Sequence, residues 1–361
     1  MLLVGAPPTL SFVLFPELER RGLDTTRARR VALSVVGVTL AAAALAGTVL
    51  AFGNAQSSEI GSFAAWASAT TAGRAWAAFI AVAALLGALT AGRYLLSDRV
   101  SRRLWLRTVT VGALAMLLAF CWTRFSTAID IPAIAILVKF GHMTGGALWV
   151  GGLAVLAVLP TLVPHESDSD PEMAEFVLSV VRQFSILAVA GVTVAFATGV
   201  IIAAWHVPTL AALATTSYGI LLSVKVGLVL IAAAIGGFNR FVLHEQISNS
   251  MRESTDRAVL PGLLTIVEPR IAATDAISTV TRSVRFELVV LAIAVGLSVV
   301  LTTVLTPSYE LLEPATTASG AIFGQSLFVG FAESLKYGAV GIGLAGSLAL
   351  GYELGKAGVT Q

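Results

Sequence analysis

Long apolar stretches separated by short polar connections run along most of this chain. A helix needs about 20 residues to cross the roughly 30 Å hydrocarbon core of a bilayer, and seven of the stretches are long enough to do so. The pattern therefore predicts seven membrane-spanning helices. Their ranges are Val31–Phe52, Ala75–Leu96, Leu104–Phe125, Pro132–Pro160, Phe184–Trp205, Ile220–Phe238 and Phe286–Thr306.

Two further apolar regions lie near the two ends of the sequence. Residues Met1–Pro16 reach only about 24 Å as a helix, which is typical of the second half of a spanning helix. Ala321–Tyr352 is too long for one simple span, so we divide it into an interfacial piece and a helix from about Leu335. No basic segment precedes the first apolar residues, and we expect no cleavable signal peptide. The predicted fold is an all-α, polytopic transmembrane bundle of eight or nine helices.

Composition excludes several classes of protein. Of the 361 residues, 57% are hydrophobic and 12% charged, against about 25% charged in a soluble domain, so no separate soluble enzyme domain fits. The net charge of +2 is too small to indicate nucleic-acid binding. The single cysteine, Cys121, excludes an internal disulfide and a CxxC site. No P-loop, HExxH motif or nucleophile elbow occurs in a credible context, and we expect no enzyme.

Arginines gather in alternate connections, which places those connections in the cytoplasm and makes the chain a multi-pass plasma membrane protein. The opposite connections hold only Arg74 and Arg124. Glu287 lies near Arg285 at the predicted cytoplasmic edge of its span, where a structural ion pair is expected. The cytoplasmic arginines are Arg20, Arg21, Arg27, Arg29, Arg30, Arg99, Arg102, Arg103, Arg182, Arg240, Arg252, Arg257, Arg270, Arg282 and Arg285.

The two halves of the sequence resemble each other at an offset of about 146 to 152 residues. Ala69–Gly73, for example, corresponds to Thr215–Gly219. Four spans per half predict a parallel internal repeat of four helices about an axis along the membrane normal, which usually places a site between the halves. We expect a first repeat at 1–130 with an abbreviated first helix, a second at 131–307, and a C-terminal interfacial segment plus a transmembrane helix at 308–361.

Ionisable residues inside spans are functional candidates, because a charge at the bilayer centre costs about 2.5 to 3.5 kcal/mol. Lys139 and His142 lie about 12 and 17 Å along the span that enters from outside near Ile131. His206 ends the next span, and Lys225 lies about 9 Å along the following one. All four occupy outer halves of adjacent helices. His142 and His206 are therefore metal-ligand candidates, although their different depths require tilted helices or a wide external vestibule for joint ligation, and charged lysines would repel a cation.

Sulfur side chains near this histidine suit copper, because thioether and thiolate ligands select Cu(I) and imidazole also binds copper. Met143 follows His142 directly, about 100° round the helix, so both can border one cavity. Met116 and Cys121 are about 140° apart on their helix and are not expected to share a site; each is more typical of packing. Glycines on both sides of Trp149 predict close helix packing.

An ordered set of motifs extends from the fifth predicted helix to the end of the last firm span. It comprises the run His142–Gly152, then Val181–Ser185 with Thr198–Gly199, then Tyr218–Gly219 through Lys225 to Asn239–Arg240, and finally Arg285–Glu287 to Leu305–Pro307. In this order the chain resembles the copper resistance D domain (CopD-type) family of membrane proteins. The resemblance covers Phe140 to Pro307 and, more loosely, the N-terminal half. It implies copper handling, with uptake across the cytoplasmic membrane from the external side.

The expected function is thus transport of copper, as Cu(I) or Cu(II), through a site containing His142 with His206 and Met143. The expected partners are the lipid bilayer, the copper ion and an external copper-binding protein, without nucleic acid. The alternative is a membrane b-type cytochrome with His142 and His206 as axial haem ligands, which needs two imidazoles facing each other at similar depth. A third interpretation is a structural or sensory protein without a transported substrate. Iron content distinguishes the cytochrome from the copper transporter, and copper accumulation distinguishes the transporter from a protein without a transported substrate.

Overall fold

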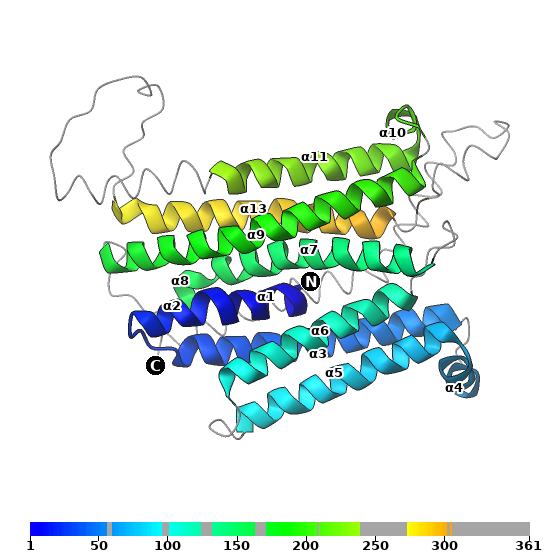
Figure 1. The fold of residues 1–361 in the computed structure, drawn as a ribbon, viewed down its shortest axis with the longest axis horizontal. Coiled ribbons are helices and arrows are strands. Elements are labelled where there is room, and N and C mark those ends of the chain that lie inside the picture. The colour runs from blue at the N-terminus through cyan, green and yellow to red at the C-terminus, as the bar shows by residue number, and fades with distance from the viewer. Residues whose placement is uncertain are drawn as a thin grey trace.

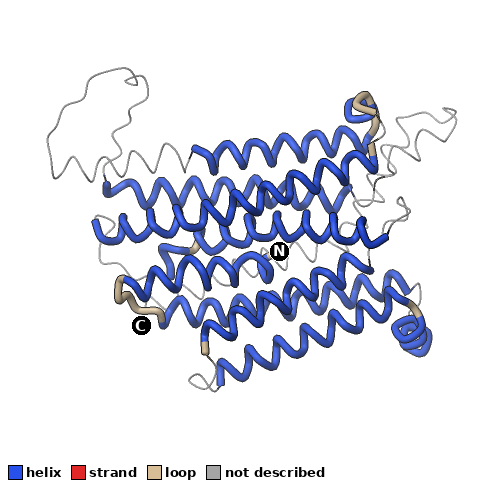
Figure 2. Tube along the Cα trace, viewed as in Figure 1, coloured by secondary structure: helices blue, strands red, loops and turns tan. Residues whose placement is uncertain are grey.

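The computed structural model describes residues 1–55, 60–95, 101–123, 132–162, 171–207, 209–238, 273–301 and 304, which form helices and short turns and contain no strand. Seven of these helices are long and apolar enough to cross a membrane, and each lies on one of the seven predicted spans (Figures 1 and 2). The elements are α1 Leu2–Thr9, the π-helical turn η1 Leu10–Leu14, α2 Phe15–Arg20, α3 Thr26–Ala55, α4 Ile60–Ala69, α5 Thr71–Leu95, α6 Arg102–Thr123, α7 Pro132–Ala157, α8 Leu159–Leu162, α9 Pro171–His206, α10 Ala212–Thr215, α11 Ser217–Phe238 and α13 Ala273–Leu301.

Two of the spanning helices begin well before the apolar stretches that predict them. Helix α9 starts at Pro171 rather than Phe184, and α13 starts at Ala273 rather than Phe286. Hydropathy locates the part of a helix that suits lipid, whereas a helix can continue into water without losing its backbone hydrogen bonds. Glu287 therefore lies well inside α13 and not at its edge.

The N-terminal helical segment, residues 2–20, lies in the middle of the bundle. It consists of α1, η1 and α2, and all eight residues of α1 are buried. In Figure 1 this segment lies between α7 on one side and α3 and α6 on the other, and α1 contacts all three. It is helical as expected but is not one of the seven spans. The predicted C-terminal helix after residue 308 lies outside the described residues.

Glycines allow the central helices to approach closely. A Cβ atom added to Gly151 of α7 would lie 2.7 Å from the Cα of Gly5 in α1. A Cβ added to Gly191 of α9 would lie 2.7 Å from the carbonyl oxygen of Gly145 in α7. Lipid tails are as apolar as the side chains, so helix association in a membrane depends on such close packing. The close packing predicted for the helix that carries Trp149 is therefore confirmed.

The turns that precede α5 and α11 have the same local structure. The Thr70 hydroxyl accepts a hydrogen bond of 2.9 Å from the backbone N–H of Gly73, and the Thr216 hydroxyl accepts one of 3.1 Å from Gly219. Both glycines press against the backbone of a preceding short helix, α4 in one case and α10 in the other. The two turns that the sequence matches, at Thr70 and Thr216, thus make the same local hydrogen bond.

The outer surface of the bundle is apolar. Side chains such as Ile186 and Phe196 of α9 and Leu85 of α5 are more than 60% exposed. Such surfaces suit hydrocarbon, because a helix facing lipid gains nothing from polar groups. The fold is that of a multi-pass membrane protein.

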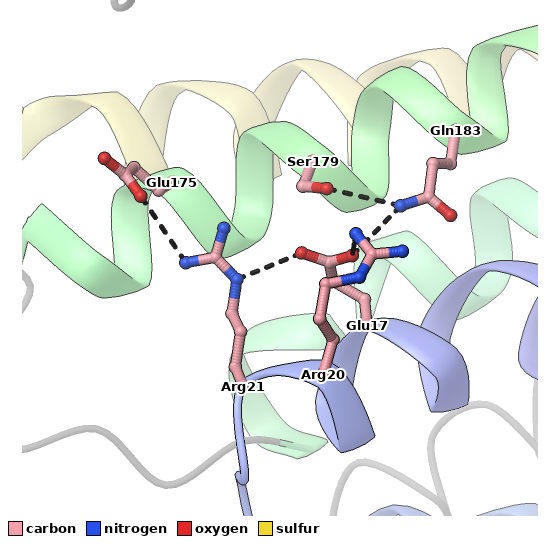
Figure 3. Close-up of polar contacts among 6 residues, drawn as sticks. All are labelled: Glu17, Arg20, Arg21, Glu175, Ser179 and Gln183. Carbon is pink, nitrogen blue, oxygen red and sulfur yellow. Dashed lines mark hydrogen bonds and ion pairs between the residues drawn. The ribbon is translucent and has the colours of Figure 1, made fainter.

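A buried carboxylate joins α2 to α9 at the arginine-rich end of the bundle (Figure 3). Glu17 is 1% exposed, and its two oxygens accept hydrogen bonds from Arg20 at 2.6 Å and Arg21 at 3.0 Å. Gln183 of α9 donates to the same carboxylate at 3.1 Å and to Ser179 at 3.2 Å. Burial raises the pKa of Glu17, but the hydrogen bonds of Arg21, Ser179 and Gln183 and the charge of Arg20 outweigh it, so the pKa lies below its ordinary value.

Neighbouring ion pairs extend this cluster to both sides of α2. Arg21 lies 3.6 Å from the carboxylate of Glu175 in α9. Glu19 accepts hydrogen bonds from Arg102 and Arg103 at the start of α6. Helix α2 is therefore tied by charged groups to a helix of each half.

Candidate functional site

His142 lies on the side of α7 that packs against α9. Its Nδ1 is 2.7 Å from the carbonyl oxygen of Ala195. A carbonyl only accepts, so Nδ1 carries the proton and a neutral imidazole keeps its lone pair on Nε2. Gly199, one turn further along α9, has no side chain, and a Cβ there would lie 3.0 Å from Cε1 of His142. The ring is thus held in the orientation and tautomer that leave Nε2 able to bind a metal.

Met143, the next residue, faces α6 instead of α9. Its Sδ lies 3.8 Å from Sγ of Cys121, a thiol that is 1% exposed. The sequence predicted packing for Cys121 and did not pair these two sulfurs, because their contact depends on how α6 and α7 are rotated. Met116, the other sulfur of α6, lies in the hydrophobic core, as expected of a packing residue.

The imidazole of His142 and the thioether of Met143 occupy one turn of α7 but face different neighbours, α9 and the Cys121 thiol of α6. The described residues contain no group of three or more His, Cys, Asp or Glu side chains able to hold a metal ion. The arrangement is therefore a nitrogen donor on α7 beside a sulfur pair that bridges α7 and α6, and it is not a cage of hard ligands. Soft thioether and thiol groups of this kind select Cu(I) over divalent hard cations.

A lysine lies near each of these donors. The charge of Lys225 on α11 acts on the His142 imidazole, and the charge of Lys139, one turn before Met143 on α7, acts on the Cys121 thiol. The position of both lysines in the outer half of the bilayer stays a prediction.

His206 does not join His142. Its Nδ1 lies 2.8 Å from the carbonyl oxygen of Ile202, and its ring stacks on Tyr218 with centroids 6.1 Å apart. Along α9, His206 is about 10 Å beyond Gly199, which contacts His142. The structure therefore keeps the two imidazoles at different depths and on different neighbours, which gives no support to a shared haem.

The residue that sequence reasoning misplaced is Glu287. It is 2% exposed, and its Oε1 accepts a hydrogen bond of 2.8 Å from the indole N–H of Trp149. Arg285, its expected ion-pair partner, instead donates to the carbonyl oxygen of Ala157 at 3.2 Å. The expectation was wrong because α13 begins at Ala273, which moves Glu287 from the helix edge into the bundle. The apolar pattern cannot predict this burial, because the charge of Glu287 was itself the reason to place the edge of the span there.

The fold is that of a polytopic helical membrane protein with an imidazole and two sulfur side chains between its helices. A family model described as copper resistance protein D matches residues 178–301, which hold most of α9 and all of α11 and α13 but not α7. The resemblance stated from the motifs is confirmed over that range. The match also agrees with the plasma membrane location that the arginines predict.

Among proteins of assigned function, the chain is similar to the copper transport protein CutJ of Bacillus subtilis (strain 168). The two are 29% identical over 131 residues, which are 36% of this chain and 23% of that protein. The chain thus matches less than a quarter of the length of this relative. No solved structure matches the chain.

Proposed function

We propose that this protein transports copper across the plasma membrane, with uptake from the external side. The observation that carries the proposal is the contact between Met143 and Cys121 beside the oriented imidazole of His142. Imidazole, thioether and thiol are the side chains that bind copper, and the similarity of the chain to copper-handling proteins supports the same metal. Side chains of this kind can bind and release a metal, and this supports a transporter rather than an enzyme.

The donors lie on neighbouring positions, so that a passing ion can transfer from one ligand to the next. Nε2 of His142 and the sulfurs of Met143 and Cys121 are on adjacent positions of α7 and on α6 that contacts it. A pair of soft ligands holds Cu(I) with few contacts, so release needs only a small helix movement. His206, near the outer end of α9, is a first encounter point for copper delivered by an external binding protein.

The site also lies between the two halves of the proposed internal repeat, because Cys121 belongs to 1–130 and Met143 to 131–307. The matched turns at Thr70 and Thr216 support this repeat. So does the contact of Gly5 with Gly151: the two are 146 residues apart and hence equivalent at the offset of the repeat, and equivalent residues meet at a two-fold axis. A movement of one half against the other would change the distance between the two sulfurs.

The test is copper and iron content of detergent-purified protein after anaerobic exposure to Cu(I). We expect near-stoichiometric copper in the wild type and a loss of affinity of about tenfold or more in His142→Ala, Met143→Leu and Cys121→Ser. Uptake of Cu(I) into proteoliposomes should fall in the same three variants. Metal content and uptake are both measured, because binding alone does not establish transport.

Matched controls keep this test specific. Met116→Leu removes a buried sulfur from the same helix as Cys121, and His206→Ala removes the other membrane histidine; neither should abolish copper binding. Copper binding that survives in all three site variants contradicts the proposed ligands. Iron with a haem absorption band that is lost in both His142→Ala and His206→Ala favours the cytochrome, and a protein that binds neither metal contradicts both functions.

A further inference from the structure

Glu287 lies at the junction of α13, α7 and α11, about 12 Å along the spanning part of α13 from Thr279. The indole N–H of Trp149 reaches its Oε1 from α7 at 2.8 Å. On the α11 side the missing side chain of Gly236 leaves room for the carboxyl, since a Cβ there would lie 3.0 Å from Oε1 and 3.5 Å from Oε2. The carboxyl therefore occupies a space between α13, α7 and α11.

No cation compensates this carboxyl among the described residues. Arg285 is engaged with the carbonyl of Ala157. Lys225 is about 16 Å from Gly236 along α11, and His142 is about 10 Å from Trp149 along α7. The charged or titratable side chains that the structure describes on the helices packed against Glu287 and on its own helix are Lys139 and His142 on α7, Glu175, Arg182 and His206 on α9, Tyr218 and Lys225 on α11, and Arg282 and Arg285 on α13. None of them is hydrogen-bonded or ion-paired to Glu287.

A single N–H donor is too little for an ionised carboxylate in such surroundings. In a protonated carboxyl, one oxygen can accept a hydrogen bond while the other carries the proton. Trp149 donates to Oε1, so Oε2 is available for the proton. Loss of the proton becomes favourable when a positive charge arrives nearby or when water reaches the group. The same helix α7 carries Trp149 and, two turns closer to the outside, the donors His142 and Met143.

We propose that Glu287 is a proton-binding site that releases its proton to cytoplasmic water when copper occupies the donors on α7, and takes it back when copper leaves. The inference rests on the proposed function for its copper step. In each cycle one O–H bond of the carboxyl breaks and reforms on the same side of the membrane, so there is no net movement of protons. The carboxylate formed in this way attracts the cation from the outer donors towards the cytoplasmic end of the bundle.

The first measurement is the infrared carbonyl stretch of a protonated carboxyl in the purified, copper-free protein at neutral pH. The wild type should show a band that is absent in Glu287→Gln, whereas Glu17→Gln, which changes the other buried glutamate, should leave it in place. Glu287→Asp should shift the band without removing it, and this variant serves if Glu287→Gln does not fold. A spectrum unchanged by Glu287→Gln overturns the proton site, whether or not the protein transports copper.

The second measurement follows the same band during anaerobic addition of Cu(I). The band should disappear in the wild type and persist in His142→Ala, which lacks the outer donor. In proteoliposomes Glu287→Gln should bind copper as the wild type does but pass it at least several-fold more slowly, with a weakened dependence on the pH of the cytoplasmic face. Copper that binds without changing the band overturns the coupling, while a Glu287 band in a protein that binds no copper contradicts the proposed function and leaves the proton site standing.

Discussion

Glu17 and Glu287 are buried to almost the same extent, with 1% and 2% of their surfaces exposed, but their surroundings are opposite. Glu17 accepts hydrogen bonds from two arginines and a glutamine, whereas Glu287 accepts one from an indole. A buried carboxylate is tolerated when paired and hydrogen-bonded, and otherwise it holds a proton. The donors around a buried acid, more than its burial, therefore separate a structural charge from one that can change during function.

Their positions in the bundle agree with this difference. Glu17 lies beyond the seven spans, at the end where arginines gather, and ties the central segment to α9. Glu287 lies inside a span, on a helix that contacts both α7 and α11. The first carboxylate holds helices together, and the second is hydrogen-bonded to Trp149 of α7, the helix that also carries His142 and Met143.

The largest effect is expected from removing the structural charge. Glu17→Ala leaves Arg21 and Gln183 without their buried acceptor and should lower the free energy of unfolding by about 2–4 kcal/mol. Thermal unfolding of the detergent-solubilised protein measures this loss. Arg20→Ala is the control, since that arginine is 65% exposed and should contribute about 1 kcal/mol or less. Equal effects of the two substitutions would contradict the structural role of Glu17.

A smaller effect is expected at Trp149, and its size reports the charge of Glu287. Trp149→Phe removes one hydrogen bond, which is worth about 1 kcal/mol to a neutral acceptor and about 1.5–3 kcal/mol to a charged one. The loss of unfolding free energy caused by Trp149→Phe is measured once in the wild type and once in Glu287→Gln, so that the packing contribution shared by both backgrounds cancels. The two losses should agree, because glutamine resembles the protonated acid. A clearly larger loss in the wild type would show that Glu287 is ionised.

The smallest effect is the response of Glu17 to acid. Its folded pKa lies below the ordinary value of 4.5, so its stabilisation is present above that value and is lost as the pH falls through the folded pKa. The difference in melting temperature between wild type and Glu17→Gln should therefore narrow between neutral pH and about pH 3. A difference that stays constant over this range would mean that protonation of Glu17 does not matter for stability.

Sequence alone determined the seven spans and the neighbours along each helix. Every backbone group in a bilayer must be satisfied inside the protein, so an apolar stretch of sufficient length becomes a helix whatever its partners. The adjacency of His142 and Met143 follows from the same rule, and so does the glycine-rich surface near Trp149. These features depend on residues close together in the chain.

Tertiary structure alone decided which side chains face each other across helices. Cys121 meets Met143, His142 meets Ala195, and Glu287 meets Trp149 instead of Arg285. Each of these contacts depends on the rotation and depth of two helices, which are set by glycine contacts and by where a helix begins. Hydropathy carries no information on either quantity, because lipid accepts any apolar face equally.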